Sequence, residues 1–487
     1  MAYIEGTDRF QAQFMDWFSF DNLISDDNYV RIIDAFVDSL NLKDLGFSTF
    51  SGESRGQKPY HTETLLKIHI YCFYNGIQSS RKQERECARN IELIWLTGNL
   101  KPDHSTIASF CKNNSAALEN VFKQFAQICR KLELFDFKIW AVDGTKIKAN
   151  CSKKRAFTVE KLEKAILNID KKIEEYMKHI SDTDSNDAAT IAEFQHKLEL
   201  IKKRKVQYSD LKQTMVDQNI SEVCLTDTDA KVMKNHSNIE PCYNVQSAVD
   251  SKHKLILDFS VTNQANDVGL LKPMSDKIFE DYQLGDFLQQ NPQHSILQLA
   301  DCGYYKIDDI IVLNSSYLKT IVPKPAASNS TGCSDFSKDK FVFDPDTNSY
   351  TCPAGQSLPF YRKSTETKNG VTNHYNIYAG TACSSCPHLN DCTKSPNGRS
   401  IKRNVQEDLL LALDNEAKSD SSFYKLRKEL VEHPFGTIKR ALGLDHVYIK
   451  GLHRVSSWTA SVFLVYNFKR VFNILGFKEF MKAVTSN

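Results

Sequence analysis

The sequence predicts a mixed α/β fold that combines a helical N-terminal domain, a mixed sheet and two insertions. Apolar residues recur every three or four positions through most of residues 1–135. After residue 136, short β-rich runs alternate with helical stretches. Two segments, 157–217 and 328–404, differ from their surroundings in composition. At 487 residues the chain is too long for one ordinary core, so large insertions or several domains are expected.

The composition is that of an ordinary globular protein, with 41% hydrophobic and 25% charged residues. The net charge is only +2, so a nucleic-acid partner would have to be bound by local basic patches. We expect no membrane partner, because no run of about eighteen apolar residues occurs. The first residues lack the pattern of a signal peptide. The expected location is therefore the cytoplasm, where the thirteen cysteines would not form a disulfide framework.

Residues 1–135 are predicted to be helical. The stretch "SDDNYVRIIDAFVDSLNL" begins with a Ser-Asp cap signal and then places Val30, Ile33 and Val37 on one helix face. Further along, Gly98 separates the predicted helix "SSRKQERECARNIELIWLTG" from "DHSTIASFCKNN". That layout fits a helix-turn-helix motif that binds DNA, and it equally fits two neighbouring helices of a bundle.

A long polar block at about 157–217 predicts an antiparallel helical hairpin. Its apolar residues step by threes and fours on both sides of the polar stretch "SDTDSND": Leu162, Ile166, Ile169, Ile173, Tyr176 and Ile180, then Ile191, Phe194, Leu198 and Ile201. The hairpin would either project as an arm or pack along the surface of the domain. The spacing alone fits both arrangements.

Two aspartates stand at the ends of predicted strands. Asp143 ends "IWAVD" and Asp301 ends "ILQLAD", and a glycine follows each within two residues. A carboxylate in this place lies at the edge of a sheet and is fixed by the core behind it, which suits a ligand of a hard cation such as Mg²⁺. An Asp-Gly sequence after a strand is also a common hairpin signal, so either aspartate alone is explained by a turn.

A third carboxylate, Glu432, lies in "YKLRKELVEHPFGTIKR". Glu432 and Lys439 are two turns apart and would share one face if the helix continues past Pro434. Tyr424 and Lys428 precede Glu432 by eight and four residues and would lie on that face as well. The face would then surround a carboxylate with phosphate-binding groups. An exposed helix with salt bridges would have the same spacing.

The chain resembles the DDE transposases of bacterial insertion sequences. The resemblance rests on four stretches taken together: "VDGTKIKAN", "YNVQSAVD", "ADCGYY" and "YKLRKELVEHPFGTIKR". Residues 61–112 resemble the N-terminal domain of one large group of them. The resemblance runs over nearly the whole chain in the right order. It implies an RNase H-like catalytic core in which Asp143, Asp301 and Glu432 form the acidic triad.

The resemblance also implies a chemistry. The triad would hold two Mg²⁺ or Mn²⁺ ions, and a water or a 3′-hydroxyl would attack phosphorus without a covalent protein intermediate. Tyr424, Lys428 and Lys439 would match the tyrosine, basic residue and lysine around the family's glutamate. Arginine is usual at the basic position, and Arg427 lies beside Lys428, so the register stays open.

The resemblance implies that the partner is double-stranded DNA, both the transposon ends and the target. It also implies a homo-oligomer on DNA and an association with the bacterial nucleoid. Basic residues close to the acids would contact phosphates and make binding depend on salt. The candidates are Lys146 after the first acid and Lys439 with Arg440 after the third. Asn244 and Gln246 alternate along one predicted strand, where they would orient the carboxylates, contact DNA or face solvent. Asp227 and Asp229 would lie in a loop near the metals or the DNA.

The insertion at 328–404 contains a cysteine pattern typical of structural zinc. Cys383 and Cys386 have C-x-x-C spacing, and Cys352 and Cys392 would complete a tetrahedral Cys₄ site in a zinc-ribbon-like module. Zinc would fold a segment that is too polar to fold alone. Reduced thiols in a small β insertion are the alternative. Cys333 and His388 are further candidate ligands.

Four parts are therefore expected: a helical domain at 1–135, the first part of the core at 136–327 with the hairpin inside it, the insertion at 328–404, and a C-terminal helical part at 405–487 that carries the third acid. The expected function is a DNA transposase. One alternative is a repurposed transposase that binds DNA without catalysis. Another is a metal-dependent nuclease that cuts DNA and does not join it.

Overall fold

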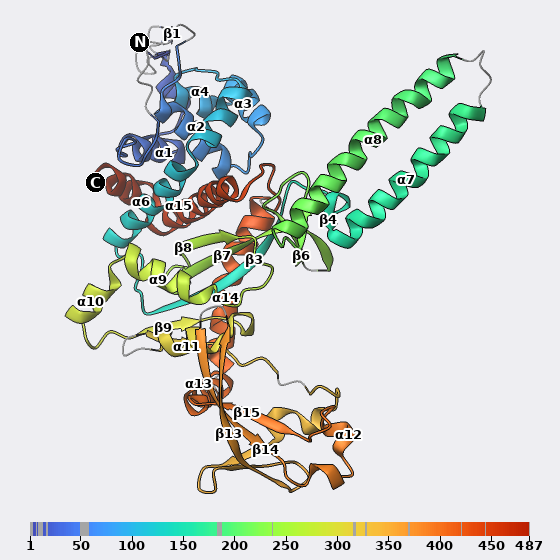
Figure 1. Ribbon diagram of the computed structural model, residues 1–487. Helices are drawn as coiled ribbons and strands as arrows, with labels where there is room; N and C mark the ends of the chain where they lie inside the picture. Colours follow the sequence, from blue (N-terminus) through green and yellow to red (C-terminus); the bar gives the residue numbers. More distant parts are fainter. Residues whose placement is uncertain are drawn as a thin grey trace.

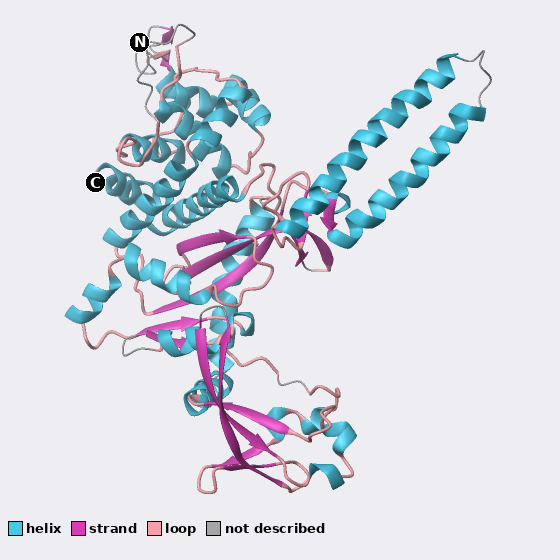
Figure 2. Cartoon of the chain, in the orientation of Figure 1, coloured by secondary structure: helices cyan, strands magenta, loops and turns pink. Residues whose placement is uncertain are grey.

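In the computed structural model, a helical domain, a central sheet and a β-rich insertion follow one another along an elongated molecule, and a helical arm projects from its middle (Figure 1). The structure describes residues 3–5, 7, 13–15, 18–48, 58–182, 188–235, 237–314, 318–326, 329–368, 371–419, 421–443 and 445–486. The predicted boundary at residues 327 and 328 and the middle of the predicted hairpin turn, residues 183–187, lie outside these ranges. The prediction of a mixed α/β fold is confirmed (Figure 2).

The N-terminal domain begins with the short strands β1 (Gln13–Met15) and β2 (Phe18–Ser19) and the 3₁₀ turn η1 (Phe20–Leu23), and continues with six helices: α1 (Tyr29–Asp38), α2 (Thr62–Tyr74), α3 (Ser80–Arg89), α4 (Ile91–Thr97), α5 (His104–Asn113) and α6 (Ser115–Lys131). The side chains of Asn28 and Asp103 accept hydrogen bonds from the first amides of α1 and α5. The stretch expected to form one helix before Gly98 is two helices, because Asn90 has extended backbone angles and caps α4.

The central sheet has the strand order β10-β9-β3-β7, with both β6 and β8 paired to β7. Strand β3 (Ile139–Lys148) is antiparallel to β7 (Asn238–Asp250) and parallel to β9 (Ile296–Leu299), which is parallel to β10 (Leu318–Ile321). Strands β6 (Lys231–Asn235) and β8 (Ile256–Thr262) pair with successive parts of β7. Three helices lie between β8 and β10 in the sequence: α9 (Leu271–Asp281), α10 (Leu284–Gln290) and α11 (Ile307–Leu313).

Helices from the end of the chain pack against the sheet. Leu430 and Val431 of α14 (Ser421–Gly436) are buried in one cluster with Ala141 of β3 and Leu299 of β9. This packing fixes α14, which carries Glu432, next to the strands that carry Asp143 and lead to Asp301.

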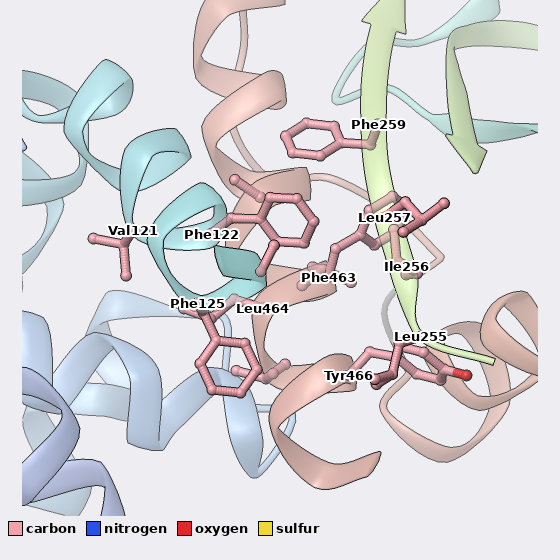
Figure 3. Close-up of a cluster of buried hydrophobic side chains, with 14 of the residues drawn as sticks. Val121, Phe122, Phe125, Leu255, Ile256, Leu257, Phe259, Phe463, Leu464 and Tyr466 are labelled. Carbon is pink, nitrogen blue, oxygen red and sulfur yellow. The ribbon is translucent and has the colours of Figure 1, made fainter. Parts of the chain in front are cut away.

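The last helix, α15 (Leu452–Thr485), joins the sheet to the N-terminal domain; its backbone is interrupted at Gly476. Phe259 of β8 lies between Phe122 of α6 and Phe463 of α15, with ring centroids 5.2 and 5.5 Å away (Figure 3). Burial of each phenyl ring stabilises the folded state by roughly 1.5–3 kcal/mol relative to an exposed ring. The buried Asn467 side chain bonds both the N–H and the C=O of Ile256, at 2.9 and 2.8 Å, and so satisfies the backbone at the first residue of β8. The helical domain and the sheet therefore share one core.

The predicted hairpin consists of α7 (Val159–Asp182) and α8 (Ala188–Asp217), which run antiparallel and project away from the body (Figure 1). At its foot, the short strands β4 (Ala156–Thr158) and β5 (Glu222–Cys224) pair with each other. Phe157, Leu162 and Met215 are buried together there and close the base of the arm.

The insertion has a five-stranded antiparallel sheet and a small core of its own. The strands follow one another in sequence order: β11 (Val342–Asp344), β12 (Ser349–Thr351), β13 (Ser357–Lys368), β14 (Val371–Ala379) and β15 (Ser400–Asn404). Tyr350, Leu358 and Tyr378 are buried between them. The short helix α12 (Leu389–Cys392) precedes β15, and α13 (Glu407–Ser419) leads back to α14. Among the helices that the structure describes, none has the length and apolar character needed to cross a membrane.

Candidate active site

Asp143 lies on β3, directly after the buried Ala141 and Val142. Its carboxylate accepts a hydrogen bond from the amide of Gly144 at 2.9 Å and lies 3.6 Å from the guanidinium of Arg427 on α14. The side chain of Asp143 is 24% exposed and that of Arg427 is 13% exposed. The first predicted acid is therefore held by a strand, and a cation from another element stands next to it.

Asp301 follows β9, the parallel neighbour of β3. Its carboxylate caps a 3₁₀ turn, Cys302–Tyr304, by accepting a hydrogen bond from the amide of Gly303 at 2.8 Å. A side chain at position 303 would begin 2.9 Å from the Asp301 carboxylate and 3.7 Å from that of Asp267. Gly303 thus leaves the space between two carboxylates open. Asp301 follows the end of β9 as predicted, whereas the prediction that Asp143 ends a strand is wrong, because β3 stays paired with β7 as far as Lys148.

Asp267 is an acid of this site that the sequence analysis missed. Its carboxylate accepts hydrogen bonds from Asn244 at 2.7 Å, from Gln246 at 2.8 Å and from Lys146 at 3.2 Å. Gln246 in turn accepts a hydrogen bond from the hydroxyl of the buried Tyr304. The expectation that Asn244 and Gln246 orient carboxylates thus agrees with their contacts. The only signal for Asp267 was an Asp followed within two residues by glycine in "NQANDVG", where it reads as a loop.

The electrostatics of Asp143 reflect its neighbours. Burial raises the pKa of Asp143 to about 6; the nearby negative charges of Asp301 and Asp267 raise it as well, while the guanidinium of Arg427 and the Gly144 amide lower it. A buried carboxylate with two acidic neighbours favours a bound cation, because a cation relieves the repulsion among them. The charge and chemistry of these carboxylates therefore suit a divalent cation, although the described side chains are not gathered closely enough to hold one as they stand.

Arg427, and not Lys428, faces the acids. Lys428 is 52% exposed, and its ammonium lies 3.7 Å from Glu432, which is 64% exposed. The Nε of Arg427 is buried and has no hydrogen-bond partner in the part of the chain that the structure describes. Of the two basic residues between which the sequence left the register open, Arg427 is therefore the one that lies beside a predicted acid.

The other predicted phosphate-binding residues differ in their contacts. Lys439 donates to the hydroxyl of Thr145 at 2.5 Å, two residues beyond Asp143, and burial lowers the pKa of Lys439. Lys146 is paired with Asp267. Tyr424 is 58% exposed, with the Arg427 guanidinium 5.7 Å from its ring centroid. Arg440 is exposed. Lys146 and Lys439 therefore adjoin the acids, and Tyr424 and Arg440 lie on the surface.

Glu432 does not take part in the carboxylate cluster in this conformation. Helix α14 continues through Pro434 and changes to a π-helix over Thr437–Ala441, where the amide of Leu442 bonds the carbonyl of Thr437. A π-turn has more residues per turn than an α-helix, so it shifts the face on which later side chains lie. The predicted shared face is wrong: Lys439 contacts β3, whereas Glu432 is paired with Lys428 on the outside.

Among the described residues, no group of three or more His, Cys, Asp or Glu side chains is close enough together to hold a metal ion as it stands.

Asp227 and Asp229, which were expected in a loop near the metals or the DNA, bind the backbone at the start of the last helix. Their carboxylates accept hydrogen bonds from the amides of Gly451 and Leu452, at 3.1 and 2.8 Å, and so cap the start of α15.

The four predicted zinc ligands, Cys352, Cys383, Cys386 and Cys392, line one small cavity of about 30 Å³ in the insertion. Backbone amides point at two of the sulfurs: Gln356 lies 3.3 Å from Cys352, and Arg399 lies 3.5 Å from Cys383. Burial raises the pKa of the Cys392 thiol, and the other three cysteines raise it further. None of the thirteen cysteines forms a disulfide.

Two glycines next to the cavity, Gly380 and Gly398, leave room for the side chain of Cys383. A side chain at Gly380 would begin 2.4 Å from the Cys383 sulfur, and one at Gly398 would begin 2.5 Å from its Cβ. Of the further candidate ligands, Cys333 packs against the small core of the insertion and His388 lies against the ring of Phe336. The four cysteines come from the residue after β12, the 3₁₀ turn before α12 and α12 itself.

Two family models match the chain. The model of a "Transposase domain (DUF772)" matches residues 18–113, and that of a "Transposase DDE domain" matches residues 351–472. The second match contains Glu432 and Lys439, and Asp143, Asp267 and Asp301 lie between the two matches. Among solved structures, the chain is similar to a piggyBac transposase synaptic complex with hairpin DNA, with 8% identity, a TM-score of 0.29, and coverage of 94% of this chain and 79% of that chain. No curated protein matches the sequence.

Proposed function

On the premise that the chain belongs to the DDE-type transposases, as its two transposase domains in N-terminal and C-terminal order indicate, we propose that it cuts insertion-sequence ends and joins them to target DNA. The observation that carries this proposal is the meeting of Asp143 and Asp301 at one edge of the sheet, with Arg427 from α14 beside them. Its partner would be duplex DNA, and holding two ends together would require a homo-oligomer on DNA. A cell in which it acts would be bacterial, with the protein at the nucleoid.

We assign the central sheet to the RNase H-like type. Support comes from the order of the strands in the sheet, β8-β7-β3-β9-β10. Along the chain, β3, β7 and β8 pair antiparallel in turn, and β9 and β10 then run parallel to β3. In such a sheet the first and fourth strands are neighbours, so an acid within the first strand can lie level with one that follows the fourth. Here those strands are β3 with Asp143 and β9 with Asp301.

Asp143 and Asp301 are the proposed ligands of the divalent ions, with Glu432 as the third acid. Two Mg²⁺ or Mn²⁺ ions, when bound, would activate the attacking oxygen and stabilise the leaving oxygen. Glu432 reaches the cluster only by a change of side-chain or helix position from its present pairing with Lys428. Asp267 competes for this role, because it already adjoins Asp143 and Asp301 and is held by three donors.

The basic residues have a separate part in the reaction. Arg427 offsets the charge on Asp143, and its guanidinium stabilises the charge of the phosphate under attack. Lys439 is held at β3 by Thr145 and places a positive charge two residues from Asp143. Lys146 is positioned by Asp267 and contacts the DNA backbone next to the reacting phosphate. These contacts orient the phosphate and require no covalent intermediate.

One observation favours a second candidate function, a transposase-derived DNA-binding protein without catalysis. Glu432 points outward, and the described acids do not form a complete metal site as they stand. A nuclease that cuts without joining is a further variant of the first function. A strand-transfer assay with precleaved ends and Mg²⁺ separates the variants, because only a transposase joins such ends to a target plasmid.

Removal of the acids should abolish the reaction. With a plasmid that carries the element's own ends, Asp143→Asn and Asp301→Asn are expected to lower the rate of Mg²⁺-dependent cleavage by about a thousandfold or more, because each removes one principal catalytic group. Glu432→Gln should lose as much, and Asp267→Asn should lose less. If the Asp267→Asn enzyme were inactive and the Glu432→Gln enzyme fully active, Asp267 and not Glu432 would be the third acid of the metal site. Undiminished cleavage by Asp143→Asn would refute the triad.

The assignment of the basic residue is tested by a matched pair of neighbours. Arg427→Ala removes the buried donor beside Asp143 and is expected to lower the cleavage rate by about a hundredfold, the cost of losing one transition-state donor. Lys428→Ala removes only an exposed ion pair and should leave cleavage within about threefold of the wild type. The opposite order of the two rates would show that the acids are served by Lys428.

We further propose that the four cysteines bind one structural Zn²⁺. Amides directed at the sulfurs of Cys352 and Cys383 fit thiolate ligands, and glycines leave room around Cys383. With all four positions filled by protein, the ion would have no catalytic task.

Zinc analysis of the purified chain should give about one Zn²⁺ per molecule, because one Cys₄ set binds one ion. Cys383→Ser should lose most of it, whereas Cys151→Ser, which changes a cysteine at the foot of the arm, should retain it. A Cys383→Ser protein with the zinc content of the wild type would contradict the site.

A further inference from the structure

We propose that the arm formed by α7 and α8 carries a second DNA-contact surface, which rests on the proposed function and extends it. The surface is a group of six basic residues, here called the basic collar, that surrounds the middle of the arm: Lys171, Lys172, Lys202, Lys203, Arg204 and Lys205. Its ligand is the phosphate backbone of duplex DNA that passes the catalytic acids.

The register of the two helices brings the collar together. Lys205 of α8 pairs with Asp170 of α7 at 2.6 Å, and Lys212 pairs with Glu163 at 2.8 Å. Because the helices run antiparallel, these pairs place Lys171 and Lys172 level with Arg204 and Lys203. Two basic stretches that are thirty residues apart in the sequence thus form one belt.

Most of the collar is free to bind an anion. Lys171, Lys172, Lys202, Lys203 and Arg204 are exposed. Within the described residues, ion pairs occur only for Lys203, with Glu199 at 2.7 Å, and for Lys205. Acids do lie one turn away, Glu174 and Glu175 from Lys171 and Glu199 from Lys202, but within the described residues none of them pairs with these two lysines. Four cations on one belt without an ion pair are an arrangement that fits a polyanion.

A basic cleft leads from the catalytic strand to the arm. It has a volume of about 890 Å³, and its lining includes Lys148, Lys153, Arg155 and His446 as well as one acid, Glu240, which pairs with Lys148 at 2.9 Å. Lys148 is the last residue of β3, the strand that carries Asp143. Arg155 directly precedes β4 at the foot of the arm. Cations are thus present at the site, at the foot of the arm and along the arm.

The distances suit a short length of duplex. Lys171 is twelve residues beyond the start of α7 at Val159, which is about 18 Å along a helix. About five base pairs span that length. Beyond the collar, toward the tip, Glu174, Glu175 and Glu199 give the arm negative charge, so the phosphate contact should end there.

A second copy of the chain is the other partner that an arm of this kind would fit, since Leu167, Met177 and Leu200 are exposed on it. Exposed single apolar residues are common on protein surfaces, whereas a belt of unpaired cations beside a basic cleft is not. The charge pattern therefore favours DNA, and self-association is an outcome of the test.

Binding of a 40-base-pair duplex, followed by fluorescence anisotropy between 50 and 250 mM salt, tests the proposal. The collar variant is Lys171→Gln with Arg204→Gln, and the matched control is Lys178→Gln with Lys197→Gln toward the tip. Each lost phosphate contact lowers the slope of log K against log salt by about 0.9. We expect a slope lower by about 2 and at least a tenfold weaker affinity at low salt for the collar variant alone.

Each other result has one meaning. A wild-type slope in the collar variant would overturn the arm contact and leave the proposed function standing. Absence of DNA binding by the wild-type chain would instead count against the proposed function. Equal losses in both variants would show that general charge, and not the collar, is at work. Loss of self-association in the collar variant without DNA, measured by sedimentation, would assign the collar to a second copy. Unchanged circular dichroism and melting temperature verify the fold of both variants.

Discussion

The parallel pairing of β3 with β9 is the constraint on which the rest of the site depends. It places Asp143 and Asp301 at one edge of the sheet, although 157 positions separate them in the chain. Burying the Asp143 carboxylate, and placing it beside Asp301 and Asp267, costs free energy, and the cost appears as the raised pKa of Asp143. The buried residues of both strands and the packing of α14 hold the arrangement against that repulsion. A site of this kind is stable when a positive charge, from a metal ion or from the Arg427 guanidinium, offsets the negative charge of the carboxylates.

The surrounding elements serve this edge in different ways. Helix α15 joins the sheet to the N-terminal domain through Phe463 and through Asn467, which bonds both backbone groups of Ile256. The arm and the cysteine insertion have small cores of their own, so either can extend far from the sheet without disturbing it. The catalytic edge thus sits on a rigid centre, and the two insertions offer separate surfaces to long nucleic acid.

Local patterns were enough to predict much of this from the sequence. The strands that carry or precede Asp143 and Asp301, the helical hairpin and the four clustered cysteines each have a short-range signature, namely a β-rich run before Asp, a spacing of three and four, or C-x-x-C. The strand that carries Asp143 runs on to Lys148, because it stays paired with β7, and the glycine after Asp143 marks no turn. What failed depended on contacts between distant residues. Asp267 reads as a loop residue until Asn244 and Gln246 are seen to hold it. The choice between Arg427 and Lys428 required knowledge of how α14 lies on the sheet. The π-helix after Pro434 changed the face expected for Lys439, and helical periodicity does not reveal such a turn.

Calorimetric titration of Mn²⁺ into the purified chain tests the central claim, that Asp143 and Asp301 form one cation site, most directly. The wild-type chain and Lys428→Ala are expected to bind Mn²⁺ with similar affinity, and the double variant Asp143→Asn with Asp301→Asn is expected to lose that binding while it keeps its melting temperature. Wild-type Mn²⁺ affinity in the double variant would contradict the account, because the two carboxylates would then not be the ligands that the sheet brings together.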